Sequence, residues 1–186
     1  MIAGQPSAAL ARVSERVSLR TWIWLAPGIF LVHDVEELAT AEGWLRSHAA
    51  ALPVALQVRA ATVMTSRLAV SVAVLLGLFV IAAWDGARRA KVGKRSWLFL
   101  LAAGALAGNS LTHLAQATWF GGYTPGVVTA VLVCMPYAIL LARALERAGL
   151  LTRRHAMVLL AAGILIQAPI VLAALAVGGN LAAAVP

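Results

Sequence analysis

A compact group of ionisable residues lies near the start of this 186-residue chain. Four of its seven acidic residues fall within nine positions: Asp34, Glu36, Glu37 and Glu42. His33, Glu36 and Glu37 share one face of a helix, which advances about 100° per residue. The same face carries Thr40 and Trp44, whereas the other two carboxylates point elsewhere. Helical bundles use this spacing to present an imidazole and carboxylates to one metal ion.

A second group of polar residues interrupts an apolar stretch later in the chain. Asn109, His113 and Gln116 stand at positions i, i+4 and i+7, which places them on one helical face. With the first group they supply two imidazoles and two glutamates as metal ligands: His33, Glu36, Glu37 and His113. This donor set suits one divalent ion, Zn²⁺ or Fe²⁺, with an open coordination position. It is small for a di-iron centre, which typically uses more carboxylates.

The composition indicates an integral membrane protein. Of the residues, 62% are hydrophobic and only 12% are charged, whereas soluble domains carry about 25% charged residues. The net charge is +8, but the basic residues lie in short clusters between long uncharged stretches. This distribution is typical of membrane topology, so we expect membrane lipids and no nucleic acid as partners. The single cysteine, Cys134, excludes an intrachain disulfide and favours a packing role.

Five apolar segments predict an all-α integral membrane bundle of about five transmembrane helices. We expect them near Thr21–Leu45, Ala60–Trp84, Trp97–Phe120, Val127–Leu145 and Ala156–Val177. The third and fourth segments share an uncharged run, 96–142, which is too long for one crossing of about 20 residues. The Gly- and Pro-rich segment 121–126 breaks this run. Pro136 and Pro169 lie inside the last two helices and predict kinks.

The distribution of Lys and Arg sets the expected orientation. With five crossings, twelve basic residues fall on the side of the N-terminus and three on the other side. Loops rich in Lys and Arg stay cytoplasmic, so we expect the N-terminus in the cytoplasm. The chain then divides into a basic cytoplasmic segment (1–20), one transmembrane domain (21–178) and a short uncharged tail (179–186). No cleavage site follows the first apolar stretch, which favours a retained helix over a signal peptide.

In this topology the polar faces of the first and third helices lie at a similar height. At about 1.5 Å per residue, Glu37 lies roughly 22 Å and His113 roughly 24 Å above the start of its helix. An unpaired carboxylate at membrane depth costs about 2.5 kcal/mol or more. We therefore expect the two polar faces to meet in one site. There are two structural alternatives. The first polar face could belong to an interfacial helix that exposes its polar side to water, and His113 could serve only as an interhelical hydrogen-bonding group.

Taken together, the motifs resemble those of the HXXEE family of small bacterial membrane proteins. The family pattern is an HxxEE motif near the N-terminus, a later histidine and a YxPG motif. The corresponding residues here are His33-Asp34-Val35-Glu36-Glu37, His113 and Tyr123-Thr124-Pro125-Gly126. The resemblance covers roughly 22–137 and implies the site, but no reaction, because the family has no established activity. The YxPG segment is also a plain tight turn; in the functional interpretation Tyr123 is a hydrogen-bond donor above His113.

Three functions fit these residues. The leading hypothesis is a membrane-embedded metalloenzyme for a lipid-like or small apolar substrate, with Glu36, Glu37 and Tyr123 as catalytic residues. The residues expected to contact the substrate are Asn109, Gln116, Trp119 and Trp44. The second is a metal-free isomerase or cyclase with Glu36 and Glu37 as acid and base. The third is a carrier of metal ions or protons that uses the same cluster.

Further alternatives are a haem between the two histidines and a structural or partner-binding role. We disfavour the haem because the adjacent glutamates suit an axial ligand poorly. The third helix also contains many small residues, which favour close packing within a monomer or between subunits, so an oligomer is compatible with the sequence.

Overall fold

The computed structural model of the chain describes residues 17–52, 57 and 65–184. All secondary structure in these residues is helical, which confirms the predicted all-α class. The elements are α2 (Leu19–His48), η1 (Ala49–Ala51), α4 (Thr65–Ala90), α5 (Trp97–Trp119), α6 (Val127–Thr129), η2 (Ala130–Cys134), α7 (Met135–Arg147) and α8 (Arg153–Ala184). Since α6, η2 and α7 follow one another without a gap, the described residues form five long helical rods.

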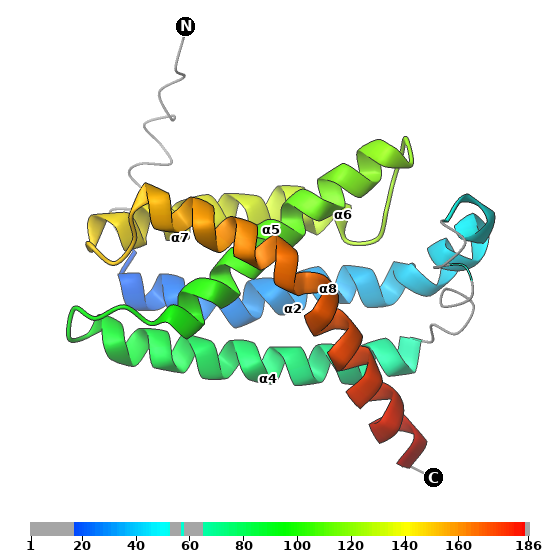
Figure 1. Ribbon diagram of the computed structural model, residues 1–186, viewed down its shortest axis with the longest axis horizontal. Helices are drawn as coiled ribbons and strands as arrows, with labels where there is room; N and C mark the ends of the chain where they lie inside the picture. Colours follow the sequence, from blue (N-terminus) through cyan, green and yellow to red (C-terminus); the bar gives the residue numbers. More distant parts are fainter. Residues whose placement is uncertain (1–16, 53–56, 58–64, 185–186) are drawn as a thin grey trace, which may run out of the picture.

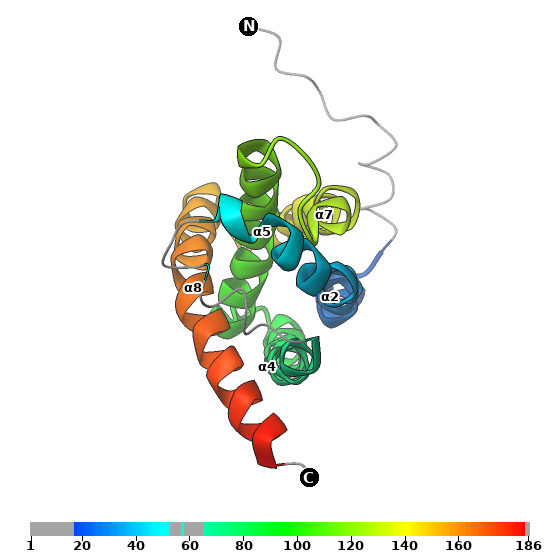
Figure 2. The same ribbon diagram turned by 90° about the vertical axis from the view of Figure 1, so that its right-hand side faces the viewer.

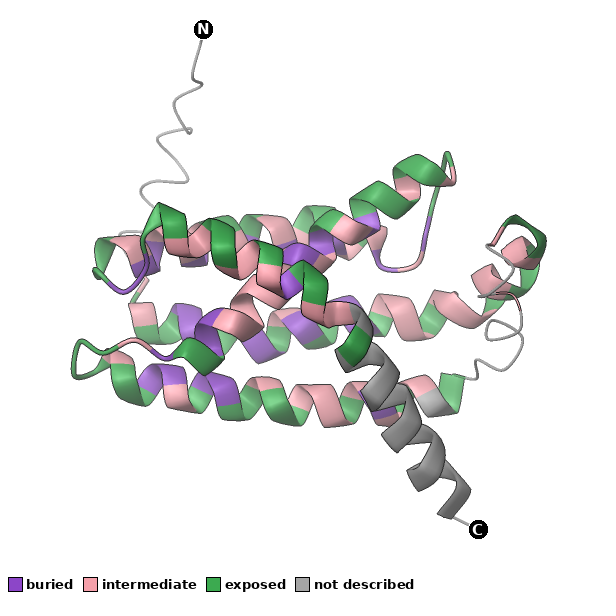
Figure 3. Cartoon of the chain, viewed as in Figure 1, coloured by how far each residue is buried: buried purple, intermediate pink, exposed green. Residues whose placement is uncertain are grey.

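These five rods pass back and forth along the long axis of the molecule (Figure 1). α2 packs against α4 on one side and α7 on the other. α5 crosses the bundle at an angle and packs against α8, which also contacts α4. Seen end-on, α5 lies between α8 and the pair formed by α2 and α7 (Figure 2). The buried residues gather on the faces where these helices meet (Figure 3).

Three helices in the described part are long and apolar enough to cross a membrane. They are Leu68–Ala90, Trp97–Trp119 and Val127–Arg147. The second, third and fourth predicted segments correspond to them, although the start expected for the second, Ala60, lies outside the described residues. α2 carries the acidic group and is less apolar than these helices. Five crossings and a cytoplasmic N-terminus remain predictions.

Helix boundaries follow from local capping chemistry. Ser18 caps α2 by accepting a hydrogen bond from Thr21 N at 3.1 Å. Ser96 caps α5 in the same way, accepting from Phe99 N at 3.1 Å. Such caps satisfy backbone N–H groups that have no partner within the helix. The last helix, α8, continues to Ala184 and therefore includes most of the segment 179–186 that was predicted as a tail.

A wide helical turn, η2, interrupts the rod that contains α6 and α7. Pro136 has no N–H, and its ring crowds the carbonyl of the residue four positions earlier. Met135 N–H instead bonds to Ala130 O, five residues back, which widens the turn. The predicted distortion at Pro136 is therefore present, and it lies directly after Thr129.

The contact between α5 and α8 depends on glycine. A Cβ atom added to Gly163 would lie 2.4 Å from the Gly104 backbone. A Cβ atom added to Gly108 would lie 2.8 Å from the Ile164 side chain. The backbones of α5 and α8 therefore lie so close that a side chain at Gly163 or Gly108 would clash. The small residues of the third predicted helix favoured such close packing.

Candidate metal centre

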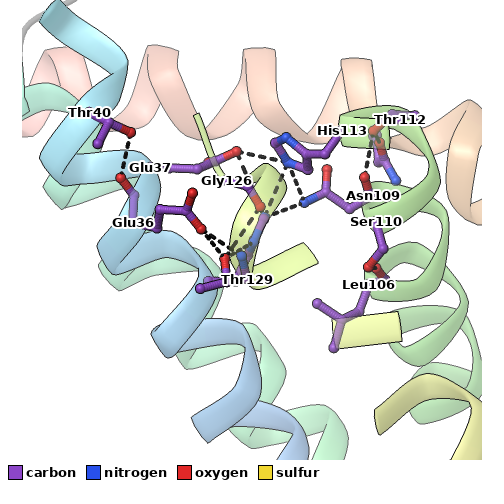
Figure 4. Close-up of polar contacts among 12 residues, drawn as sticks. Glu36, Glu37, Thr40, Leu106, Asn109, Ser110, Thr112, His113, Gly126 and Thr129 are labelled. Atoms are coloured by element: carbon purple, nitrogen blue, oxygen red, sulfur yellow. Dashed lines mark hydrogen bonds and ion pairs between the residues drawn. The ribbon is translucent and has the colours of Figure 1, made fainter. Parts of the chain in front are cut away.

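The side chains of His33, Glu37 and His113 meet between α2 and α5 (Figure 4). The two histidine Nε2 atoms are 3.2 Å apart. Glu37 Oε1 lies 2.9 Å from His113 Nε2 and 3.8 Å from His33 Nε2. The imidazoles are buried, whereas the Glu37 side chain is 33% exposed. The expected meeting of the two polar faces is thus confirmed, and Glu37 forms the accessible edge of the cluster.

Helix periodicity explains how these groups are presented. His33 and Glu37 are one turn apart on α2, and Asn109 and His113 are one turn apart on α5. Asn109 Nδ2 lies 2.9 Å from His33 Nε2 and 3.2 Å from His113 Nε2. Its amide therefore joins the cluster, and a rotation of that amide would present an oxygen to the same place.

Glu36, the other predicted carboxylate ligand, is held at the start of α6. Its Oε2 accepts hydrogen bonds from Thr129 N at 2.7 Å and Thr129 Oγ1 at 2.6 Å. Its Oε1 accepts from Tyr123 Oη at 3.0 Å and Val128 N at 3.3 Å. A carboxylate is favourable here because the first N–H groups of a helix point outward and carry partial positive charge. The structure thus engages both oxygens of Glu36 outside the three-residue cluster.

The second nitrogens of the two imidazoles have different surroundings. His33 Nδ1 lies 2.9 Å from Thr129 Oγ1. His113 Nδ1 is buried and has no hydrogen-bond partner among the described residues. The two rings therefore present the same atom, Nε2, to the cluster, but only the ring of His33 is held by a hydrogen bond on its far side.

Gly126 forms a backbone wall of the cluster. Its φ of +82° is a left-handed conformation that favours glycine. A Cβ atom there would lie 2.8 Å from His33 Cε1, 2.9 Å from His113 Cε1 and 3.0 Å from Glu37 Cγ. The YxPG segment predicted a tight turn here, but it gave no sign of this contact. Thr129 was missed as well, because a threonine inside an apolar helix carries no distinctive signal.

The segment between α5 and α6 is attached to α2 above the cluster. Tyr123 Oη, whose single hydrogen goes to Glu36, also lies 3.1 Å from Thr40 Oγ1. Trp44 Nε1 donates to Tyr123 O at 2.8 Å. The Trp44 ring meets the Phe120 ring edge to face. Burial, followed by the Glu36 carboxylate, raises the pKa of the Tyr123 phenol, which therefore remains a donor at neutral pH.

Three residues of the sequence-based site lie away from the cluster or face other partners. Trp119 is 82% exposed at the end of α5, and the Gln116 side chain is also exposed. Trp44 contacts the Tyr123 backbone and stacks on His48, so it does not touch the His–Glu cluster in the described contacts. Of the four residues expected to contact a substrate, Asn109 is the one that the structure brings to the imidazoles.

The donor atoms fit a metal ion in both chemistry and spacing. Two imidazoles and one carboxylate form the protein donor set of catalytic zinc sites and of non-haem iron sites with open positions. Ligands about 2.0–2.1 Å from a tetrahedral zinc lie about 3.3 Å from one another. The distances of 3.2 and 2.9 Å among the three donor atoms are close to this value, and 3.8 Å needs only a small side-chain adjustment. His33, Glu37 and His113 could therefore hold one ion.

Fold and site together define a protein that is all-helical in its described part, with three helices long and apolar enough to cross a membrane and a His–Glu cluster between α2 and α5. The chain matches, over residues 24–141, the family described as a protein of unknown function with an HXXEE motif. It belongs to this family, as its motifs predicted. No curated protein and no solved structure matches the chain. Its function therefore has to be argued from the site.

Proposed function

We propose that this protein is a membrane-embedded metalloenzyme whose ion is bound by His33, Glu37 and His113. The observation that carries the proposal is the geometry of the cluster: two buried imidazole Nε2 atoms 3.2 Å apart face one carboxylate oxygen. A bundle that only needed interhelical hydrogen bonds would not require two histidines and a glutamate at one point. Three protein ligands leave a position open for a substrate oxygen or a water.

The bound ion would polarise a substrate oxygen or lower the pKa of a bound water. The residues of the chain would do the rest. Asn109 is placed to hydrogen-bond a group beside the two imidazoles, and Gly126 keeps its side of the cluster narrow. Glu36 and Tyr123 form a hydrogen-bonded pair next to the site, with the phenol as the donor. In this proposal they position the site and do not bind the ion.

The surroundings favour a lipid-like or small apolar substrate. Of the three apolar helices that are long enough to cross a membrane, α5 carries His113 and the α6–α7 rod begins beside Glu36. We further propose that α2 and α8 also cross, with the N-terminus in the cytoplasm, as the asymmetry of basic residues predicts. The cluster would then lie at membrane depth, where Glu37 is its accessible edge. A substrate that partitions into the bilayer would reach it more readily than a charged metabolite.

Metal content tests the centre directly. Purified protein from cells grown with added zinc and iron is expected to contain about one metal ion per chain by elemental analysis. His33→Ala, Glu37→Gln and His113→Ala should each lose most of it, because each removes one of the three ligands. His48→Ala is the matched control: it removes a histidine that stacks on Trp44 away from the cluster, and should keep the metal. Metal-free parent protein, or variants that retain the ion, would contradict the proposal.

Activity separates the enzyme from its alternatives. We expect metal-loaded protein, incubated with a total membrane lipid extract, to change at least one lipid in the mass spectrum. Chelator-treated protein and His113→Ala should not. Turnover that survives complete removal of the metal would favour the metal-free acid–base enzyme. Ion flux into proteoliposomes that disappears in Glu37→Gln, without any change in lipids, would favour the carrier.

A further inference from the structure

Glu36, Thr129 and His33 form a continuous hydrogen-bonded chain from the start of α6 to the cluster. Thr129 Oγ1 lies 2.6 Å from Glu36 Oε2 and 2.9 Å from His33 Nδ1. The Thr129 backbone N–H also donates to Glu36 Oε2, at 2.7 Å, so the carboxylate and the threonine are joined twice. The hydroxyl of Thr129 is therefore held in place, because both the backbone and the side chain of Thr129 are bound to one group.

The number of hydrogens available on Thr129 determines which group donates in each of these hydrogen bonds. A threonine hydroxyl has a single hydrogen to donate. Its candidate acceptors are Glu36 Oε2 at 2.6 Å, His33 Nδ1 at 2.9 Å if that nitrogen is bare, and Gly126 O at 3.3 Å. The bond to the carboxylate is the shortest of the three, and bonds to charged acceptors are roughly twice as strong as neutral ones. The hydrogen therefore goes to Glu36, and Thr129 Oγ1 can only accept from His33.

The donors around Glu36 support the same direction. Its two oxygens accept from four groups: Tyr123 Oη, Val128 N, Thr129 N and Thr129 Oγ1. Four donors fill the acceptor sites of a carboxylate. No lone pair of Glu36 is therefore left to bind a proton that the carboxyl group could donate to Thr129.

From this geometry we infer that Glu36 acts through Thr129 to fix the tautomer of His33, with hydrogen on Nδ1 and a bare lone pair on Nε2. Nε2 is the atom that faces His113 and Glu37. Metal-binding histidines commonly donate their other ring N–H to a carboxylate or carbonyl, which fixes the tautomer and raises the basicity of the ligand. Here a hydroxyl is inserted between the imidazole and the carboxylate. Glu36 and Thr129 are thus positioning residues, and this role rests on the proposed metal centre.

The tautomer can be measured without any metal. In chelator-treated protein labelled with ¹⁵N-histidine, long-range proton–nitrogen correlation spectra distinguish a protonated from a bare ring nitrogen. The His33 signals are identified by their loss in His33→Ala. We expect a protonated Nδ1 and a bare Nε2 in the parent and in Thr129→Ser, which keeps the hydroxyl. In Thr129→Val, which keeps the shape but removes the acceptor, hydrogen should appear on Nε2.

Metal affinity provides the second measurement. Loss of such an outer partner typically weakens metal binding about 10- to 100-fold. We expect Co²⁺, followed by its visible absorption, to bind Thr129→Val more weakly by this factor and Thr129→Ser about as well as the parent. Glu36→Gln, with a neutral amide in place of the carboxylate, should weaken binding in the same direction.

The two measurements distinguish failure of the tautomer assignment from failure of the proposed metal centre. A parent His33 with hydrogen on Nε2 would overturn the tautomer assignment, whatever the protein binds. A Thr129→Ser variant as weak as Thr129→Val would overturn it too, since packing rather than the hydroxyl would then decide. A parent protein that binds no Co²⁺ but shows the expected tautomer would overturn the metal centre and leave the assignment in place.

Discussion

At the scale of single residues, Gly126 is a position where even one added methyl group would meet the cluster. Its backbone has a φ of +82°, and the space where a Cβ would stand is occupied by His33, His113 and Glu37. Gly121 has a similar backbone, with a φ of +66°, but nothing lies within 4 Å of its Cβ position. Alanine substitutions at the two glycines therefore distinguish two effects. Both would strain the backbone, but only the one at Gly126 would also bring a methyl group into contact with the cluster.

We therefore predict that Gly126→Ala lowers metal affinity at least tenfold, because the methyl group displaces the ligands. Gly121→Ala should leave the affinity unchanged. Both substitutions should destabilise the fold by about 1–2 kcal/mol, the usual cost of a left-handed conformation for a residue with a Cβ. Calorimetric titration with Zn²⁺ and thermal unfolding of the same samples measure the two effects. Equal affinities in the two variants would contradict the role of Gly126 as a wall.

The three residues of the cluster were predictable from the sequence, whereas the groups that support them were not. His33, Glu37 and His113 stand out because ionisable side chains are rare in apolar helices and must find partners there. Thr129 and Gly126 are ordinary residues in such helices and in turns. The functions of Thr129 and Gly126 depend on which side chains from α2 and α5 lie beside them, and that is decided by tertiary packing. For the same reason, periodicity alone did not separate Glu36 from Glu37.

At the scale of elements, α5 holds the site in place through its contact with α8. Gly104 and Gly163 bring the two backbones together, and Gln167 Nε2 donates to Ala105 O at 3.0 Å beside them. α5 carries Asn109 and His113 one and two turns further along. A change at the crossing is therefore expected to move those two side chains relative to α2.

Gly163→Ala tests this coupling. Its methyl group would meet Gly104 and Ala105 backbone atoms at 2.4–2.6 Å, which cannot move without moving α5. Overpacking of this kind typically costs about 1–3 kcal/mol, and we expect a lower unfolding temperature together with weaker metal binding. Gly77→Ala in α4 is the control, since nothing lies within 4 Å of its Cβ position. It should be neutral or slightly stabilising; a Gly163→Ala protein that behaves like it would contradict the coupling.

The helices themselves followed largely from hydropathy and turn residues. The uncharged run and its Gly-Pro break placed α5 and the α6–α7 rod to within a few residues. The wide turn η2 could be anticipated as a distortion at Pro136 but not as a five-residue hydrogen-bond pattern. The oblique crossing of α5 and α8 was also not predictable, because small residues favour close packing without selecting the partner helix or the angle.

At the scale of the whole molecule, the connection between α4 and α5 and the connection between α5 and α6 lie at opposite ends of the bundle (Figure 1). The first carries the basic residues Lys91, Lys94 and Arg95, and the second, 120–126, carries none. The asymmetry of Lys and Arg predicts that the first connection is cytoplasmic and the second is on the outer side.

Cysteine labelling measures this orientation. In a Cys134→Ala background, we expect Gly122→Cys to react with a membrane-impermeant maleimide on right-side-out vesicles. Lys94→Cys should react only after the membrane is permeabilised. Both positions are exposed in the structure, so access across the membrane decides the result. The reverse labelling pattern would invert the orientation and place the His–Glu cluster nearer the cytoplasmic surface.

The distance along the chain between Glu36 and its partners also bears on biosynthesis. Val128 and Thr129 follow Glu36 by 92 and 93 positions. At about 5–20 residues per second, the ribosome needs roughly 5–20 s to make that stretch. Throughout this interval the nascent α2 holds the Glu36 carboxylate without the amide and hydroxyl groups that later donate hydrogen bonds to it. We expect α2 to stay with the insertion machinery, and to settle in the bilayer only when α6 arrives.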